Sequence, residues 1–409
     1  MSLSATHAIV EDVARSSYGR LVAYLASRSR DIASAEDALS EAFASALQRW
    51  PIDGLPEKPE AWLLRAARNR LIDAARHAEV RKRAEPLLQL AGDAEELATM
   101  QPTFPDERLK LLFVCAHPAI DVAARTPLML QTVLGLGAAR IAAAFLVSPA
   151  AMDQRLVRAK TKIREAGIAF RVPEPPEWDE RASFVLDAIY AAYTTGWEHA
   201  GNDEAAHHPL ATEALSLGRT LTGLLPKDPE AHGLLALMLH CEARRAARFG
   251  PDGQFISLDE QDTRLWSREK MNEAEEHLRL AYAHKRIGRY QLEAAVQSIH
   301  AARATTGSID WKEIALLYEG LVRLAPSVGA HVGRAVALAK ATNAAAGLAA
   351  LESIPTTHSG TYQPWWAARA HLLGWLGRTA EARAAFEKAA TLTQDSALRI
   401  YLLRRAGRL

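Results

Sequence analysis

The stretch from Leu136 to Gly167, LGAARIAAAFLVSPAAMDQRLVRAKTKIREAG, restricts the fold most strongly. Ser148 and Pro149 in its middle supply a capping hydroxyl and a proline suited to a first helical turn, so a second helix is expected to begin there. One apolar stripe runs along that helix at steps of four, three and four residues, and it consists of Met152, Leu156, Ala159 and Ile163. Two short helices, a tight turn and a basic outer face indicate a helix-turn-helix, although a solvated amphipathic helix would show the same periodicity.

Positive charge gathers in two segments of a chain that is otherwise balanced. The 409 residues include 49 Lys and Arg against 48 Asp and Glu, which gives a formal net charge of +1. From Trp62 to Arg83, however, seven basic residues stand against two acids, and from Arg155 to Arg171 six stand against one. Two concentrated basic segments are typical of a protein that touches a polyanion at two places.

Length and composition narrow the class of protein. A chain of 409 residues with 49% hydrophobic content is expected to be globular, with two or three domains. Cys115 and Cys241 are its two cysteines, so a disulfide framework is not indicated and a reducing compartment fits. The start, MSLSATHAIVEDVARSS, does not resemble a signal peptide, and no apolar run is long enough for a membrane span. We therefore expect a cytoplasmic protein with no membrane partner.

Helices are predicted from about residue 5 to residue 78, with the breaks concentrated in PIDGLPEKP, residues 51–59. The segment Asp31–Trp50 has one apolar face, formed by Ile32, Ala35, Leu39, Ala42, Phe43 and Leu47. Its acidic outer face fits either a solvated helix or a docking surface for a basic partner. The segment Glu60–Arg76, EAWLLRAARNRLIDAAR, places several arginines on one side of a helix.

These segments, taken in order, resemble a known family. AEDALSEAF followed by WLLRAARNRLIDAAR resembles region 2 of sigma-70 family initiation factors, and TPLMLQTVLGLGAARIAAAFLVSPAAMDQRLVRAKTKI resembles their region 4. The order and spacing are similar to those of the extracytoplasmic-function class, which keeps only these two regions. The resemblance implies an all-α fold, with region 2 over residues 1–83, a linker over 84–105 and region 4 over 106–172.

The composition changes after the proline-rich segment 172–176, where Ala- and Leu-rich helices take over. Near the end, LGRTAEARAAFEKAATL fits part of the tetratricopeptide helix-pair pattern, and weaker repeats precede it. Such pairs bury their apolar faces only against neighbours, so residues 177–409 are predicted to form a tetratricopeptide-like array of stacked helix pairs. This part also resembles the extension carried by one subgroup of extracytoplasmic-function sigma factors.

The resemblance implies a transcription initiation factor, which is not an enzyme and needs no cofactor. Its partners would be core RNA polymerase and the −10 and −35 elements of promoter DNA. In the family the acidic helix of region 2 binds the largest polymerase subunit, which here implicates Asp31, Glu36, Asp37, Glu41 and Phe43. The basic helix after it would lie against the −10 element through Trp62, Arg65, Arg68, Asn69, Arg70 and Arg76. The family places a pocket for an unstacked base at the loop 51–59 beside Trp50 and Trp62, and core packing is the alternative for either tryptophan.

The resemblance also assigns the recognition helix of region 4 to the major groove of the −35 element. The residues implied are Ser148, Ala151, Asp153, Gln154, Arg155, Arg158, Lys160 and Lys162. Arg155 is the best candidate for a guanine contact, whereas the later basic residues favour phosphates. Many relatives have Glu where this chain has Ala139 and Arg140, so the usual Glu–Arg bracing of the recognition helix is not expected here.

A further acidic segment, FGPDGQFISLDEQDTRLW, lies between two predicted helices and has an Asp-Gly turn. It is either a solvated loop or, as the resemblance suggests, a regulatory contact with the basic N-terminal domains or with polymerase. The residues concerned are Asp252, Gly253, Asp259, Glu260 and Asp262.

Two other functions remain open at this stage. One is a helix-turn-helix regulator whose repeat array senses a protein or peptide without using core polymerase. The other is a metal-dependent enzyme in the C-terminal half. No metal-ligand motif or nucleophile arrangement supports such an enzyme, so we expect no metal site.

Overall fold

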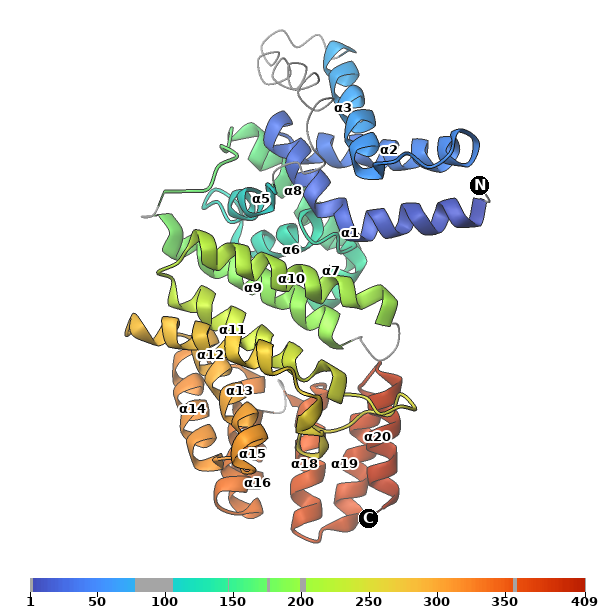
Figure 1. The fold of residues 1–409 in the computed structure, drawn as a ribbon. Helices are drawn as coiled ribbons and strands as arrows, with labels where there is room; N and C mark the ends of the chain where they lie inside the picture. The colour runs from blue at the N-terminus through green and yellow to red at the C-terminus, as the bar shows by residue number, and fades with distance from the viewer. Residues whose placement is uncertain are drawn as a thin grey trace. The chain divides into compact units, whose positions relative to one another are not determined.

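The computed structural model describes residues 3–77, 106–145, 147–174, 177–198, 204–355 and 359–408. The expected linker, residues 84–105, lies outside these ranges. All regular elements of the described residues are helices, which confirms the predicted all-α fold. Outside the helices, Phe249 and Phe255 form an isolated antiparallel β-bridge. The chain divides into two compact units, Met1–Ala192 and Tyr193–Leu409 (Figure 1).

Three helices that pack on one another form the N-terminal part of the first unit. They are α1 (Leu3–Ser29), α2 (Ile32–Asp53) and α3 (Pro59–His77). α2 begins where the Asp31 carboxylate accepts the backbone N–H of Ser34 at 3.3 Å. It continues through Pro51 to Asp53 and is capped by Gly54, whose φ is +88°, so the helix ends three residues later than the sequence predicted. The buried core between the three helices includes Ile32, Leu39, Trp50 and Leu63.

The second group of helices in this unit contains the predicted helix-turn-helix. Its members are α5 (Arg108–Cys115), α6 (Val122–Thr132), α7 (Ala138–Ala144) and α8 (Pro149–Glu165). Ser148 caps α8 by accepting the backbone N–H of Ala151 at 3.3 Å, which confirms the predicted helix start. The predicted stripe is buried, as shown by Met152, Leu156, Ala159 and Ile163. Cys115 packs in the core, where burial raises the pKa of its thiol to about 12.

The helix α9 (Trp178–Glu198) begins in the first unit. Its first residue, Trp178, donates its indole N–H to the carbonyl of Pro173 at 2.7 Å. The guanidinium of Arg125 on α6 lies 3.4 Å from the carboxylate of Glu180. These contacts tie the start of α9 to α6 and to the segment before it. The division between the units therefore falls inside α9 rather than at the proline-rich segment where the sequence placed a boundary.

The second unit is a run of helices in which neighbours in sequence pack together, as in α11 with α12, α14 with α15 and α18 with α19. Packing between successive helices is what a stacked array requires. A long loop with three short 3₁₀ turns joins α11 to α12. The helices are α10 (Glu204–Leu224), α11 (Pro229–Ala243), α12 (Arg268–Ala283), α13 (Arg289–Thr306), α14 (Trp311–Leu324), α15 (Val328–Ala341), α16 (Ala344–Glu352), α18 (Gln363–Trp375), α19 (Thr379–Thr391) and α20 (Ser396–Gly407).

A side chain of α11 caps α13. The carboxylate of Glu230 accepts the backbone N–H of Tyr290 at 2.9 Å and that of Gln291 at 3.1 Å. These N–H groups have no partner within their own helix, so Glu230 satisfies donors that would otherwise be unpaired. Gly233 lets the helices approach, because a Cβ there would lie 2.7 Å from the Gln291 nitrogen.

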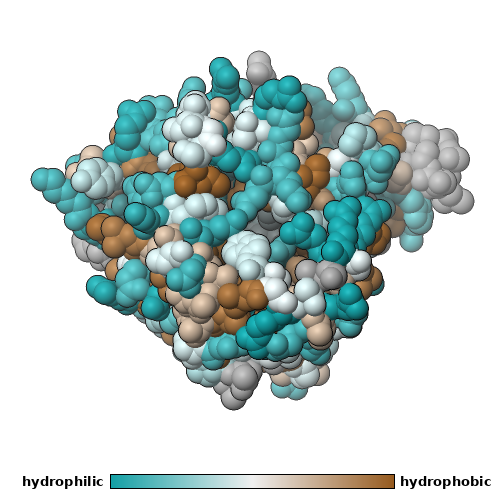
Figure 2. Space-filling model, turned by 90° about the horizontal axis from the view of Figure 1, so that it is seen from below, coloured by the Kyte–Doolittle hydropathy of each residue, from teal (hydrophilic) through white to brown (hydrophobic). Residues whose placement is uncertain are grey.

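Hydrophobic residues on the face seen in Figure 2 occur as small separate patches among hydrophilic ones. Such scattered exposure is ordinary for a folded protein surface. None of the helices within the described ranges is both long enough and apolar enough to span a bilayer.

Candidate nucleic-acid interface

The predicted docking residues on α2 divide into two groups. Asp37 and Glu41 are exposed, and Phe43 is half-buried. Asp31 is used as the N-cap of α2, and the side chain of Glu36 keeps only 14% of its surface exposed. The structure therefore leaves Asp37 and Glu41 open to a partner, whereas Asp31 and Glu36 face other parts of the same unit.

The predicted −10 residues lie on α3, where Arg65, Asn69 and Arg70 are exposed. Arg70 pairs with Glu41 of α2 at 3.1 Å, and both side chains are more than half exposed. This solvated pair joins one predicted docking residue to one predicted −10 residue and contributes little to stability. Arg68 is half-buried, and the side chain of Arg76 lies outside the described atoms.

The two tryptophans beside the predicted base pocket have different environments. Trp50 is 1% exposed and belongs to the core, whereas Trp62 is half-buried. Their rings meet edge to face with centroids 5.5 Å apart, a favoured aromatic geometry. The sequence left core packing open for both, and that alternative is correct for Trp50.

The predicted recognition helix, α8, exposes Ala151, Asp153, Gln154, Arg158 and Lys162, and its cap Ser148 is exposed as well. Arg155, the expected guanine reader, is half-buried and donates to the carbonyl oxygen of Ala123 at 3.3 Å. Its guanidinium is therefore held by the start of α6 in this conformation.

The structure brings part of the predicted −35 set into contact with part of the docking set. Lys160 on α8 forms an ion pair with Glu36 on α2, and the Lys160 side chain is 12% exposed. Arg164 lies 3.5 Å from Asp31, so a second pair joins the same helices. Burial raises the pKa of Glu36 despite the opposing attraction of Lys160, which means that removing this carboxylate from water costs more than the pairing returns.

A close contact between α1 and the end of α6 also joins the two groups of helices in this unit. Gly19 on α1 has no room for a side chain, because a Cβ there would lie 1.8 Å from the carbonyl oxygen of Val133. Tyr18 beside it is buried enough to raise the pKa of its phenol, and the charge of Glu36 adds to the rise. Sequence reasoning missed both residues. A glycine inside a helical pattern is the signal that could have drawn attention to Gly19.

The predicted regulatory loop in the second unit has a defined conformation. Gly253 adopts a φ of +68° beside Asp252, as a tight turn requires. The guanidinium of Arg303 on α13 then holds the loop by donating to the carbonyl oxygens of Leu258, Asp259 and Gln261 at 3.0–3.1 Å. Three of the predicted acids are paired within the unit, since Asp259 meets Lys340 at 3.2 Å, Glu260 meets Arg405 at 3.7 Å and Asp262 meets Arg264 at 2.7 Å.

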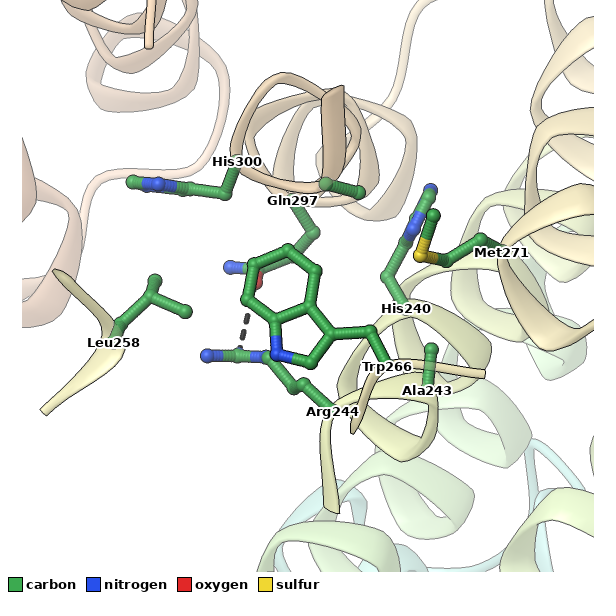
Figure 3. Close-up of a pocket in the computed structure, with 9 residues that line it drawn as sticks. His240, Ala243, Arg244, Leu258, Trp266, Met271, Gln297 and His300 are labelled. Carbon is green, nitrogen blue, oxygen red and sulfur yellow. Dashed lines mark hydrogen bonds between the residues drawn. The ribbon is translucent and has the colours of Figure 1, made fainter. Parts of the chain in front are cut away.

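A small polar cavity lies under the end of this loop, between α11 and α13 (Figure 3). At about 10 Å³ it has room for no more than about one water molecule. Arg244 donates to the Gln297 side chain at 2.9 Å, and Trp266 lines the same cavity (Figure 3). Burial lowers the pKa of His300 on its wall to about 4, so this imidazole is neutral at pH 7. Residues from the loop and from helices α11, α12 and α13 thus line one small cavity.

Among the residues that the structure describes, no three His, Cys, Asp or Glu side chains are grouped as a metal site would require.

Comparisons with known proteins add two family matches. Residues 13–81 match a model described as Sigma-70 region 2, and residues 181–282 match one described as Family of unknown function (DUF6596). The first match covers most of α1 and all of α2 and α3, which confirms the resemblance to region 2. The second extends from α9 into α12 and includes the predicted regulatory loop.

A curated relative is similar over nearly the whole chain. It is "Uncharacterized protein R00370" from Rhizobium meliloti (strain 1021), which is 39% identical over 379 residues, or 91% of this chain and 89% of the relative. No solved structure matches the chain.

Proposed function

We propose that this chain, which carries a sigma-70 region 2 and belongs to the same family as the uncharacterized protein R00370 of Rhizobium meliloti, is an extracytoplasmic-function sigma factor. In this role it directs core RNA polymerase to particular promoters and starts strand opening, without catalytic residues or a cofactor of its own. Residues 1–83 act as region 2, 106–172 as region 4, and 177–409 as a tetratricopeptide-like regulatory domain.

The observation that carries this proposal is the pairing of region 2 with a helix-turn-helix in one compact unit. α8 has a Ser-Pro start, a buried stripe and an exposed polar side, as a helix that enters a major groove needs. Ala151, Asp153 and Gln154 near its start are placed to face base edges, while Arg158 and Lys162 favour phosphates. A regulator that does not use polymerase has no need of a region 2.

Region 2 provides two neighbouring surfaces for this function. Asp37 and Glu41 on α2 supply exposed carboxylates for docking on polymerase, and Arg65, Asn69 and Arg70 on α3 supply exposed groups for the −10 element. The Arg70–Glu41 pair lies at the border of the two surfaces. When polymerase and DNA bind together, this pair would break, so that Glu41 contacts polymerase and Arg70 contacts DNA.

The free chain is proposed to be closed. In this state Lys160 and Arg164 of α8 are occupied by Glu36 and Asp31 of α2, so neither helix offers its whole binding surface. On binding, DNA phosphates would take the place of Glu36 and Asp31 beside the basic residues of α8. Basic groups of polymerase would take the place of Lys160 and Arg164 beside the acidic residues of α2.

The C-terminal unit is proposed to regulate this activity through an intramolecular or polymerase contact near the loop of Asp252, Gly253, Asp259, Glu260 and Asp262. Arg303 holds the loop in one conformation, which suits a recognition element more than a flexible tether.

Transcription in vitro with purified core RNA polymerase tests the proposal. The full chain is compared with a truncation after Glu198, which keeps the whole of α9 because its start contacts α6. Promoter-dependent transcripts from both forms support a sigma factor with a regulatory C-terminal unit, and transcripts from the full chain alone make that unit part of the active factor. If neither form yields transcripts or binds core polymerase while both bind DNA, the protein is a helix-turn-helix regulator instead.

A further inference from the structure

A groove of about 190 Å³ lies between α20 and the loop that joins α11 to α12. Loop residues 254–260 form one side, and residues 397–408 form the other. Cavities of about 150 Å³ hold a benzene ring, so this groove has room for one large apolar side chain.

The floor of the groove is apolar. Phe255 from the loop and Tyr401 from α20 meet edge to face with ring centroids 5.3 Å apart. Ile256 lines the groove beside them, and Ile400 is 50% exposed at its border. Water covers this apolar surface in the free protein, so burying it under a ligand is favourable.

The net charge of the residues that line the groove is positive, although the sequence of the loop is acidic. Three arginines, Arg404, Arg405 and Arg408, line it together with one carboxylate, Glu260. Glu260 pairs with Arg405 at 3.7 Å. No carboxylate of the described residues lies within ion-pair distance of Arg404 or Arg408.

The guanidinium of Arg404 contacts the loop side of the groove and not the end of its own helix. Basic residues at a helix end often serve only to offset the helix dipole. Here Arg404 reaches across to the side-chain oxygen of Gln254 at 3.4 Å, and the carbonyl of Ala406 near the end of α20 is met by Arg383 of α19 instead.

The loop side is held in place before any ligand binds. The backbone N–H of Ile256 donates to the Arg248 carbonyl at 2.8 Å, and that of Gly250 donates to the Gln254 carbonyl at 2.9 Å. A groove that is already ordered loses little conformational freedom when it is occupied.

We propose that this groove binds an acidic peptide segment of a partner protein, with one large apolar side chain on the floor and flanking carboxylates on Arg404 and Arg408. Guanidinium groups bind carboxylates with paired, charge-assisted hydrogen bonds. The inference rests on the proposed regulatory role of the second unit and names the chemistry of its partner.

A peptide fits these features better than a nucleic acid does. A single-stranded nucleic acid needs a basic track along its backbone with successive stacking platforms. The arginines here lie within about one turn at the end of α20 instead of along a track.

Fluorescence anisotropy with the full chain tests the proposal without polymerase, so its failure is distinguishable from failure of the sigma-factor proposal. The probe is a fluorescein-labelled peptide with one central Phe between Asp and Glu residues, compared with the same peptide carrying Asn and Gln. We expect the acidic form to bind at least about tenfold more tightly, and Arg404→Glu with Arg408→Glu to remove that preference. Lys388→Glu on α19, a single reversal, is the control for a change of surface charge, because Lys388 is exposed and does not line the groove, and it should leave binding unchanged.

Ile400→Asp provides a second variant that tests the apolar border of the groove at a half-exposed position where folding should not suffer, and it should weaken binding of both peptides. Circular dichroism checks the fold of every variant. Equal binding of the acidic peptide to the wild type and the double-arginine variant would overturn the proposal, as would no binding at all. Binding of a labelled single-stranded oligonucleotide, lost in the arginine variant while the peptides do not bind, would identify a nucleic-acid groove instead.

Discussion

Lys160 of α8 and Glu36 of α2 form an ion pair in which only 12% and 14% of the two side chains remain exposed. A residue proposed for the −35 element is thereby bound to a residue proposed for polymerase. Arg164 and Asp31, 3.5 Å apart, extend the same contact. Lys160 cannot reach a phosphate while it is held in this way, so the proposed contact of Lys160 with the −35 element requires this pair to open.

Replacing Lys160 by Glu should separate α2 from α8, because two carboxylates would then face each other where little water reaches. Spin labels at the exposed positions Gln48 and Glu165, each changed to Cys in a Cys241→Ser background, report the separation by pulsed electron paramagnetic resonance. We expect a longer and broader distance distribution. Adding Glu36→Lys to Lys160→Glu should restore the short distance, because the pair is then re-formed with its charges exchanged.

The control for this experiment is Lys162→Glu. Lys162 is exposed on the same helix, so its reversal makes the same change in net charge away from the contact. Cys115 is fully buried and does not compete for the label. If Lys160→Glu and Lys162→Glu lengthen the distance equally, the effect comes from the change in net charge, and a specific role of the Lys160–Glu36 pair is contradicted.

Closure should depend on pH through Glu36. Burial raises its pKa above the usual 4.5, and Asp37 adds to the rise while Lys160 opposes it. The closed state therefore binds a proton more readily than the open one. Closure is expected to strengthen as the pH falls through the raised pKa towards 4.5, and to level off below that. The same distance measurement across pH checks this, and Glu36→Gln should remove the dependence. Tyr18, which also faces Glu36, does not interfere because its pKa is raised far above this range.

The helices and their buried faces could be predicted because their signals are local. Ser148 caps the helix that immediately follows it, and Asp31 does the same for α2. The apolar stripe of α8 depends only on spacing along one helix, from Met152 to Ile163. A helix cap or an apolar periodicity can be recognised from a short stretch of sequence, because all the residues that form it lie in that stretch.

The ion pairs within each unit could not be predicted, because they join residues far apart in sequence. Nothing local relates Glu36 to Lys160, or Asp259 to Lys340, and the acidic loop therefore looked like a free negative surface. Arg155 fitted a base contact by position, yet the carbonyl of Ala123 holds it in this conformation. Such partners follow from how helices stack, which the pattern of one helix does not encode.

Gly19→Ala should destabilise the first unit. A Cβ there would lie 1.8 Å from the Val133 carbonyl oxygen, so α1 and the end of α6 would have to move apart. Overpacking of this kind costs about 1–3 kcal/mol and sometimes more. Chemical denaturation followed by circular dichroism measures the loss. Gly223→Ala on α10 is the control, because a Cβ there meets nothing within 4 Å, and it should stabilise by up to about 1 kcal/mol. A Gly19 variant as stable as the wild type would mean that α1 and α6 are not in tight contact.

Glu230→Gln should weaken the joint between α11 and α13. The carboxylate uses both oxygens, one for the N–H of Tyr290 and one for that of Gln291, and a glutamine amide offers only one acceptor. One N–H at the start of α13 would then face an amide NH₂, which costs about 1–3 kcal/mol when the donor is buried. The urea midpoint of the second unit should therefore fall, whereas Glu387→Gln, at an exposed position of α19, should leave it unchanged. Equal midpoints for the two variants would mean that the cap contributes nothing and that packing around Gly233 alone holds these helices together.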